Sequence, residues 1–327
     1  MGSSSFKALL IIFVVALVNS VSSQSVVCPF DFLYHLGDGV FDNGNSIVIQ
    51  PKLPAAHWPY GITYPGKPTG RWCDGLLDID IGATAMGFPV LTPYLGGNAS
   101  SNNAIIFAVA RSPILGRSFF ASRRVRIPPY AMPLNIQLSW FKQHIHSICS
   151  TPTDCVDKVG RSLILFGDVE ANDITFPLLQ GKSIREVRTY VSKVTQAQIS
   201  AAKEVIKMGA TRVILPGNVP IGCYPFILTE LGPNKNATLK ACCGIGGKYN
   251  YNGRRFCGSR GVPVCSDPNQ YIYWDGIHLT QAANDRLSQI LQVDALESLN
   301  CTSSEKIYYP LDNYNYLRQR KSVVISY

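Results

Sequence analysis

The sequence predicts an α/β fold, a three-layer sandwich in which helices flank a mainly parallel central sheet. Two short apolar runs, at 162–167 and 212–215, have the length and composition of buried strands. Between them, 184–208 carries apolar residues at helical spacing, and the order strand, helix, strand implies parallel strands joined by a right-handed crossover. A third apolar run, at 30–36, breaks into a turn rich in Gly, Asp and Asn. With 327 residues, of which 46% are hydrophobic, the chain can bury one large core or two small ones.

The segment 184–208 has the signals of a helix at both ends. Ser183 and Glu186 form a capping-box pattern at its start, and Gly209 stands where a helix ends. The residues expected to follow its apolar spacing are Val187, Tyr190, Val191, Val194, Ala201, Ala202, Val205 and Ile206.

The region 51–75 leads into another expected helix, at about 76–86. Its first part, 51–68, is rich in Pro, Gly and aromatic residues, which indicates a surface loop near the ligand-binding end of the sheet. Asp74 or Thr69 is expected to cap the helix that follows.

The N-terminus predicts a secretory signal peptide over 1–24. Lys7 precedes an apolar run at 8–18, and small and polar residues follow it. The run is short for a bilayer span, so no transmembrane segment is expected, although an uncleaved anchor or a buried helix is the alternative. This divides the chain into a leader, one α/β domain at 25–300 and a C-terminal tail at 301–327, and it predicts an extracellular protein.

All ten cysteines lie beyond the leader. An even number in a secreted chain favours disulfides, and short spacings suggest the pairs Cys149 with Cys155 and Cys257 with Cys265. The remaining connectivity stays open. A zinc site is disfavoured because no Cys-x-x-Cys pair occurs and the histidines lie elsewhere.

Charged residues and potential glycan acceptors indicate what the surface of the protein is like. The net charge is +9, and the basic residues are scattered apart from runs at 123–126 and 318–321, which lack interleaved aromatic residues. No nucleic-acid partner is expected; solvated faces or attraction to cell-wall polyanions account for the charge. Asn-x-Ser/Thr triplets predict glycan acceptors at Asn98, Asn236 and Asn300.

The turn after the first apolar run reads GDGVFDNGN at 37–45. It delivers a loop to the end of a sheet, where open α/β sheets bind ligands. Together with WDGIHLT at 274–280, it resembles the plant GDSL esterase/lipase family of the SGNH hydrolase type, and most nearly its sinapine and acetylajmalan esterase branch. That family places its nucleophilic serine third in Gly-Asp-Ser. Here Gly39 stands at that position, and glycine has no side chain with which to attack an ester.

Asp275 and His278 lie three residues apart on a tight turn, so the carboxylate can orient the imidazole as in a Ser-His-Asp triad. From spacing alone, a structural loop histidine is the favoured interpretation. The resemblance implies instead that the two residues are the inherited base and its orienting partner. Thr280 is expected to cap a helix over about 281–291.

Two family positions in the segments that form the oxyanion site are altered. A strand is expected at 105–110, and Arg111 follows where the family has a glycine whose backbone N–H helps to bind the oxyanion. The family's Gly-x-Asn-Asp block keeps Asn172, a further oxyanion donor, but its glycine is replaced by Glu170. A carboxylate there would oppose an anionic transition state. Without the resemblance, Asn172 is a turn residue.

The resemblance breaks after 217–223. Only 225–241 leads from there to the Cys-Cys-Gly segment at 242–244, whereas the family has several tens of residues more, including a long helix and a strand. The presence of one edge strand is therefore an open question, and its loss would expose the backbone of the neighbouring strand.

Two hypotheses of function follow. The resemblance implies carboxylic-ester hydrolysis of a small acyl ester or lipid, without metal or cofactor. Since Gly39 supplies no attacking atom, the chain is expected to be catalytically impaired. The alternative is an active ester hydrolase with an unrecognised nucleophile or a water activated by His278; Ser46 and Ser112 lack positional support for that role.

Overall fold

The structure is a computed structural model and describes residues 26–97, 99, 102–167, 170–215, 221–230, 239–303 and 323–326. The expected leader at 1–24 and the glycan acceptors Asn98 and Asn236 lie outside these residues. Within the described part, no helix is long and apolar enough to cross a bilayer.

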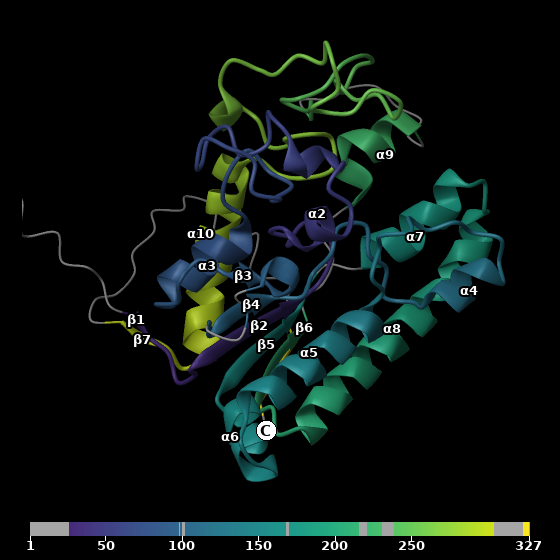
Figure 1. Cartoon of the computed structure of the whole chain (residues 1–327). Helices are drawn as coiled ribbons and strands as arrows, with labels where there is room; N and C mark the ends of the chain where they lie inside the picture. The colour runs from purple at the N-terminus through teal and green to yellow at the C-terminus, as the bar shows by residue number, and fades with distance from the viewer. Residues whose placement is uncertain are drawn as a thin grey trace, which may run out of the picture.

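A six-stranded sheet forms the centre of the molecule (Figure 1). Its first five strands are parallel, and the sixth is antiparallel to its neighbour. This confirms the predicted α/β fold with a mainly parallel sheet. The strands in spatial order are β3 (Thr92–Pro93), β4 (Ala104–Ile106), β2 (Phe32–Leu36), β5 (Ser162–Phe166), β6 (Arg212–Leu215) and β8 (Val323–Ser326).

Helices cover both faces of this sheet (Figure 1). The α-helices are α2 (Asn45–Ile49), α3 (Asp78–Ala85), α4 (Arg117–Ala121), α5 (Leu134–Ile148), α6 (Pro152–Gly160), α7 (Glu170–Leu179), α8 (Ile184–Lys207), α9 (Pro225–Glu230) and α10 (Gln281–Ser298). Single 3₁₀ turns are η1 (Pro54–Ala56), η2 (Tyr94–Gly96), η4 (Ile221–Cys223) and η5 (Pro268–Gln270).

The central strand β2 is buried on both faces because its successive side chains point into two different cores. Tyr34 belongs to the core under α5 and α8, where Phe141 and Val205 pack. Leu33 belongs to the opposite core, to which α3 contributes Ile79 and beside which α10 lies. A strand covered on both sides needs a nearly continuous apolar run, which explains why 30–36 is recognisable in the sequence.

Helix α8 begins and ends where the sequence predicts. The hydroxyl of Ser183 accepts from the Glu186 backbone N–H, and Gly209 adopts a positive φ of 111° after the last turn. The Glu186 carboxylate accepts from the Tyr190 hydroxyl at 2.7 Å, so it does not complete the expected capping box. The expected apolar face is buried at most positions, but Val191 is half exposed.

The expected cap of the helix at 76–86 is wrong. Helix α3 is preceded by Leu77, whose backbone N–H donates to Asp80 in the first turn. Asp74 instead accepts from the Gln281 N–H at 2.7 Å, at the start of α10, where Thr280 also caps as predicted. Asp74 acts on a helix some two hundred residues away because the tertiary fold brings the two loops together.

Four disulfides link the described cysteines, and Cys73 and Cys223 are free. The expected pair Cys149–Cys155 is confirmed. The expected pair Cys257–Cys265 is wrong: Cys257 bonds to Cys243, and Cys265 bonds to Cys242. The chain folds back so that the N–H of Cys265 donates to the carbonyl of Cys242 at 2.9 Å. This contact brings Cys265 to Cys242, its disulfide partner, although Cys257 is nearer to it in the sequence. The fourth pair is Cys28–Cys301.

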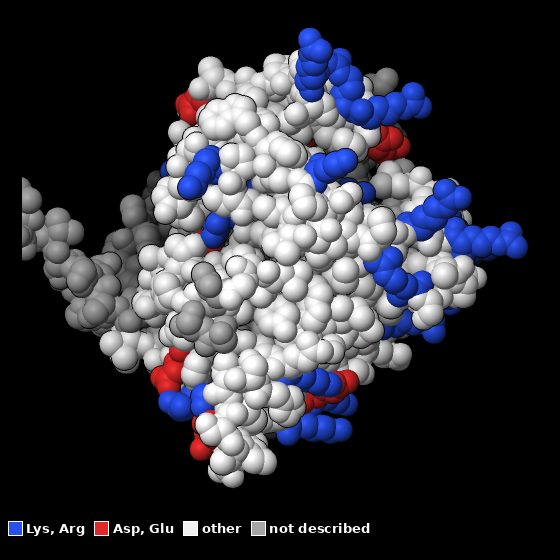
Figure 2. Space-filling view, viewed as in Figure 1, with Lys and Arg blue, Asp and Glu red and all other residues white. Residues whose placement is uncertain are grey.

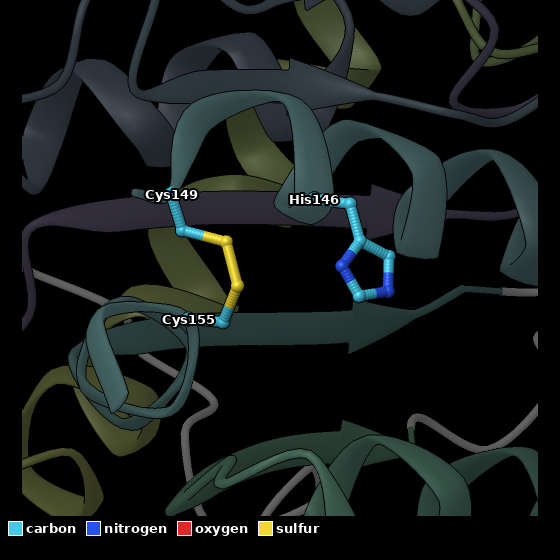
Figure 3. A group of neighbouring side chains, drawn as sticks. All are labelled: His146, Cys149 and Cys155. Atoms are coloured by element: carbon cyan, nitrogen blue, oxygen red, sulfur yellow. A yellow bond between two sulfur atoms is a disulfide. The ribbon is translucent and has the colours of Figure 1, made fainter. Parts of the chain in front are cut away.

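His146 lies beside the Cys149–Cys155 disulfide (Figure 3). The three side chains are close enough to share a metal ion, but the two sulfur atoms are bonded to each other. Metals bind cysteine as a thiolate, so this cluster offers only the imidazole as a ligand while the disulfide is intact.

The sheet edge beside β6 is occupied by β8. The register pairs Arg212 with Ser326 and Leu215 with Val323, in antiparallel orientation. The sequence leaves open whether an edge strand is present here. The C-terminal segment supplies one, because β8 pairs with the backbone of β6 and covers it. Nearby in sequence, β7 (Thr302–Ser303) pairs with β1 (Val26–Val27) next to the Cys28–Cys301 disulfide.

Charged side chains do not form one continuous patch on the visible face of the molecule (Figure 2). Lys and Arg stand in separate groups, at the top, right and bottom of the view and at a few places within its upper half, with uncharged surface between them. A scattered distribution of this kind gives a general attraction to anionic surfaces rather than a track for a polyanion.

Candidate active site

A pocket opens at the carboxyl end of the parallel strands. Asp38 and Gly39 follow β2, Arg111 follows β4, Asn172 lies in α7 after β5, and His278 lies just before α10. Four residues that the sequence places at the site line this pocket, namely Gly39, Arg111, Asn172 and His278, and a fifth, Asp275, contacts the Nδ1 atom of His278. Its apolar lining comes from Val40, Leu179, Tyr224, Phe226 and Ile277.

Gly39 faces the imidazole of His278 directly. A Cβ atom built on Gly39 would lie 2.7 Å from His278 Nε2. Real Cβ atoms essentially never approach a heavy atom more closely than 3.0 Å. The residue at position 39 therefore points at the base of the dyad, and the imidazole occupies space that a side chain there would need.

Asp275 and His278 form a buried pair. His278 Nδ1 lies 2.8 Å and 3.0 Å from the two carboxylate oxygens, and the His278 backbone N–H donates to Oδ1 at 2.9 Å. Burial opposes ionisation of Asp275, but attraction to His278 and the hydrogen bonds that the carboxylate accepts hold its pKa below the ordinary value. An ionised carboxylate on Nδ1 leaves Nε2 turned toward position 39, the orientation that a general base requires.

Two aromatic side chains hold this dyad, and the sequence did not single them out. The Tyr60 hydroxyl donates to Asp275 Oδ2 at 2.6 Å, and burial followed by the neighbouring Asp275 raises the Tyr60 pKa well above its usual range. The Trp72 ring packs on His278 with centroids 5.2 Å apart, and its Nε1–H donates to the Ser46 hydroxyl at 3.1 Å. Tyr60 belongs to the stretch at 51–68 that is rich in Pro, Gly and aromatic residues, whereas Trp72 lies beyond it and had no signal of its own.

The two serines considered as substitute nucleophiles have other partners. Ser46 accepts the Trp72 bond, and the Ser112 hydroxyl accepts from the Met132 N–H at 2.9 Å. Both are fully buried, and neither lines the pocket. Their hydroxyls hold loops together.

Arg111 lies in the left-handed backbone region, with φ 62°. Glycine adopts this conformation readily, whereas other residues adopt it at a cost. The guanidinium carbon lies 5.2 Å from the centre of the Phe176 ring, and its buried Nε has no hydrogen-bond acceptor among the described residues. The preceding Ala110 N–H donates to the buried Asp42 carboxylate at 2.8 Å, which ties this loop to the turn after β2.

Asn172 uses both protons of its amide inside the protein. Nδ2 donates to Asp38 Oδ2 at 2.6 Å and to the Ser112 carbonyl at 3.2 Å. The next residue, Asp173, accepts from the N–H groups of Ile114 and Leu115, so it positions the loop that carries Arg111. As it stands, the Asn172 amide does not offer a free donor to a ligand.

Glu170, the other altered family position, is the first residue of α7. Its side chain lies outside the described residues, so the expected contact with Arg111 stays a prediction.

Comparison with known proteins agrees with this architecture. The family model described as GDSL-like Lipase/Acylhydrolase matches residues 33–291. The chain belongs to this family. Among its relatives, this GDSL-family chain is 38% identical over 348 residues to an acetylajmalan esterase of Rauvolfia serpentina, covering 86% of this chain and 90% of that protein. It is 33% identical over 338 residues to the GDSL esterase/lipase At1g31550 of Arabidopsis thaliana, covering 83% and 86%.

The alignment lengths also show that this member of the GDSL family is shortened. Since 86% of 327 residues is about 281, roughly 67 positions of the 348-residue alignment have no counterpart in this chain. The second relative leads to a similar figure, because 83% of 327 residues is about 271 of 338 positions. A gap of this size agrees with the missing tens of residues expected around 225–241.

Proposed function

We propose that this chain is a secreted GDSL esterase/lipase-like protein that binds a small acyl ester or lipid in the family pocket and is catalytically impaired. The observation that carries the proposal is the geometry at Gly39. A side chain at position 39 would point at His278 Nε2, as the attacking serine of an active member does, but Gly39 has no hydroxyl. In this scheme Asp275 and His278 are the inherited dyad, and neither a metal nor a cofactor takes part.

The expected loss of activity is large. Removal of a triad serine costs about a million-fold in turnover and leaves about a thousand-fold over water from the oxyanion site and binding. The remaining oxyanion support is also altered here, because the Asn172 amide is engaged by Asp38 and Ser112. Arg111, which stands where the family has a glycine, is also one of the residues that line the pocket.

The intact dyad favours one alternative, an active carboxylic-ester hydrolase that uses an unrecognised nucleophile or a water activated by His278. Such a water would donate a hydrogen bond to His278 Nε2 at about 2.8 Å, on the side of the imidazole that faces Gly39.

Hydrolysis of p-nitrophenyl butyrate by the purified protein tests the proposal, with an active family member as the reference. We expect no turnover above that of a His278→Ala variant. Labelling with an organophosphonate probe, followed by mass spectrometry of the intact protein, is the second measurement. Turnover that disappears in His278→Ala, or a covalent adduct, would establish the alternative.

The rest of the proposal concerns the secretory pathway. We infer a cleaved leader over 1–24, a single α/β domain at 25–300 and a C-terminal segment at 301–327. Asn300 is exposed and is one of three proposed glycan acceptors, with Asn98 and Asn236. Intact-mass analysis of protein from a secretory host, before and after N-glycan removal, checks the cleavage site and the glycans together.

A further inference from the structure

The pocket holds an unusual set of hydrogen-bond donors around Arg111. The guanidinium Nε is buried and has no acceptor among the described residues. The backbone N–H groups of Gly39 and Arg111, on two loops of the same pocket, also make no hydrogen bond to a described group. A buried donor without an acceptor costs about 1–3 kcal/mol, so the Arg111 Nε favours an anionic ligand at this pocket, and the two backbone N–H groups are further donors on its lining residues.

We propose that this pocket binds a small organic carboxylate, with the Arg111 guanidinium as the main partner of the anion. The inference rests on the proposed function, because a pocket that does not turn over an ester is free to hold an acid. A planar guanidinium offers parallel N–H donors that match the two oxygens of a carboxylate. The Phe176 ring, 5.2 Å from the guanidinium carbon, supports its cationic plane without using any of these donors.

The other lining residues select a monoanion with an apolar tail. The Asp38 carboxylate lines the same pocket and is held there by the Val40 N–H and by Asn172. Repulsion from this carboxylate grows with the charge of the ligand, so a phosphate dianion is disfavoured relative to a monoanion. The apolar surface of Leu179, Phe226 and Ile277 suits a short alkyl chain or a ring.

The same groups discriminate against neutral ligands. An ester or an amide has a carbonyl oxygen that can accept from Arg111, but it carries no charge to balance the guanidinium. Hydrogen bonds between charged partners are about twice as strong as neutral ones, so the acid should bind at least about tenfold more tightly than its amide. The product of ester cleavage, rather than the ester, is therefore the better ligand for this site.

Ligand-observed NMR titrations of the full mature protein test the proposal, with butyrate, butyramide and inorganic phosphate as probes. We expect saturable binding of butyrate and affinities at least about tenfold weaker for butyramide and phosphate. In Arg111→Gln, butyrate binding should weaken by about tenfold or more. Arg124→Gln is the matched control, because Arg124 is exposed, has a similar φ of 56° and carries the same charge, but lies outside the pocket.

Three outcomes would overturn the inference. They are equal butyrate binding by Arg111→Gln and wild type, butyramide or phosphate binding as tight as that of butyrate, and no saturable butyrate binding by wild type. The last would result if Glu170 already paired with Arg111. The comparison of probes on wild type decides the question even if the variant does not fold. Hydrolysis of p-nitrophenyl butyrate by the same preparation would refute the proposed lack of turnover and leave the carboxylate titrations to be judged by themselves.

Discussion

Restoring the missing serine provides the sharpest test of how this site differs from an active one. In Gly39→Ser the new Cβ would lie 2.7 Å from His278 Nε2, and the hydroxyl needs a hydrogen-bond distance of about 2.8 Å from its own oxygen to that nitrogen. The imidazole must therefore recede by about 1 Å. The Trp72 ring and the Asp275 carboxylate both hold it in place, so it does not move freely.

The magnitude follows from two effects. A misplacement of about 1 Å costs about a hundred-fold in rate, and the loss of one oxyanion donor costs about another hundred-fold or more. The second cost applies because the Asn172 amide is engaged elsewhere and Arg111 lines the pocket where the family has a glycine. We expect Gly39→Ser to show weak esterase activity, about ten-thousand-fold below an active relative if the two effects are independent.

The triple variant Gly39→Ser, Arg111→Gly and Glu170→Gly should be substantially more active than the single variant. It replaces Arg111, at a φ of 62°, with the residue that adopts this angle readily, and it removes the two side chains expected to obstruct the oxyanion site. The assay is kcat/KM for p-nitrophenyl butyrate.

Two control variants accompany that measurement. A His278→Ala change in the triple background should abolish the activity, and Arg124→Gly in place of Arg111→Gly should give no gain. Equal activity in the single and triple variants, at the level of active relatives, would show that Arg111 and Glu170 do not obstruct the site and that only the serine was lost.

Two further predictions concern the pH dependence of stability and self-association. Burial lowers the pKa of His35 to about 3 and that of His144 to about 4, so both side chains prefer the neutral form in the folded state. Because the same histidines take up protons in the unfolded chain, each one should lower the free energy of unfolding by roughly 3 kcal/mol between pH 6.5 and pH 4. Chemical denaturation across this range should show a smaller loss in His144→Leu and an unchanged loss in the exposed control His57→Gln; identical pH profiles in all three proteins would refute the assignment. Removal of 304–327 deletes β8 and bares the β6 edge, so we expect self-association by light scattering, and a fully monomeric truncated protein would contradict that role of β8.

The sequence by itself determined the features that depend on neighbouring residues. The apolar runs of β2, β5 and β6 and the spacing of α8 predict the parallel sheet, because burial on both faces leaves a nearly continuous apolar pattern. The turn that joins Asp275 to His278 is local as well, since a carboxylate three residues before an imidazole can reach both its N–H and its ring. Thr280 and Ser183 were predictable as caps for the same reason.

Only the tertiary structure decided which distant side chains meet. Tyr60 reaches Asp275 across 215 residues, and Asn172 reaches Asp38 across 134. Nothing in the local pattern shows that Asp74 caps α10 or that Cys265 pairs with Cys242. These contacts depend on how the loops at the carboxyl ends of the strands pack against one another, and local spacing carries no record of that packing. The same packing directs position 39, which carries no side chain, at His278, and it places Arg111 in the lining of the same pocket.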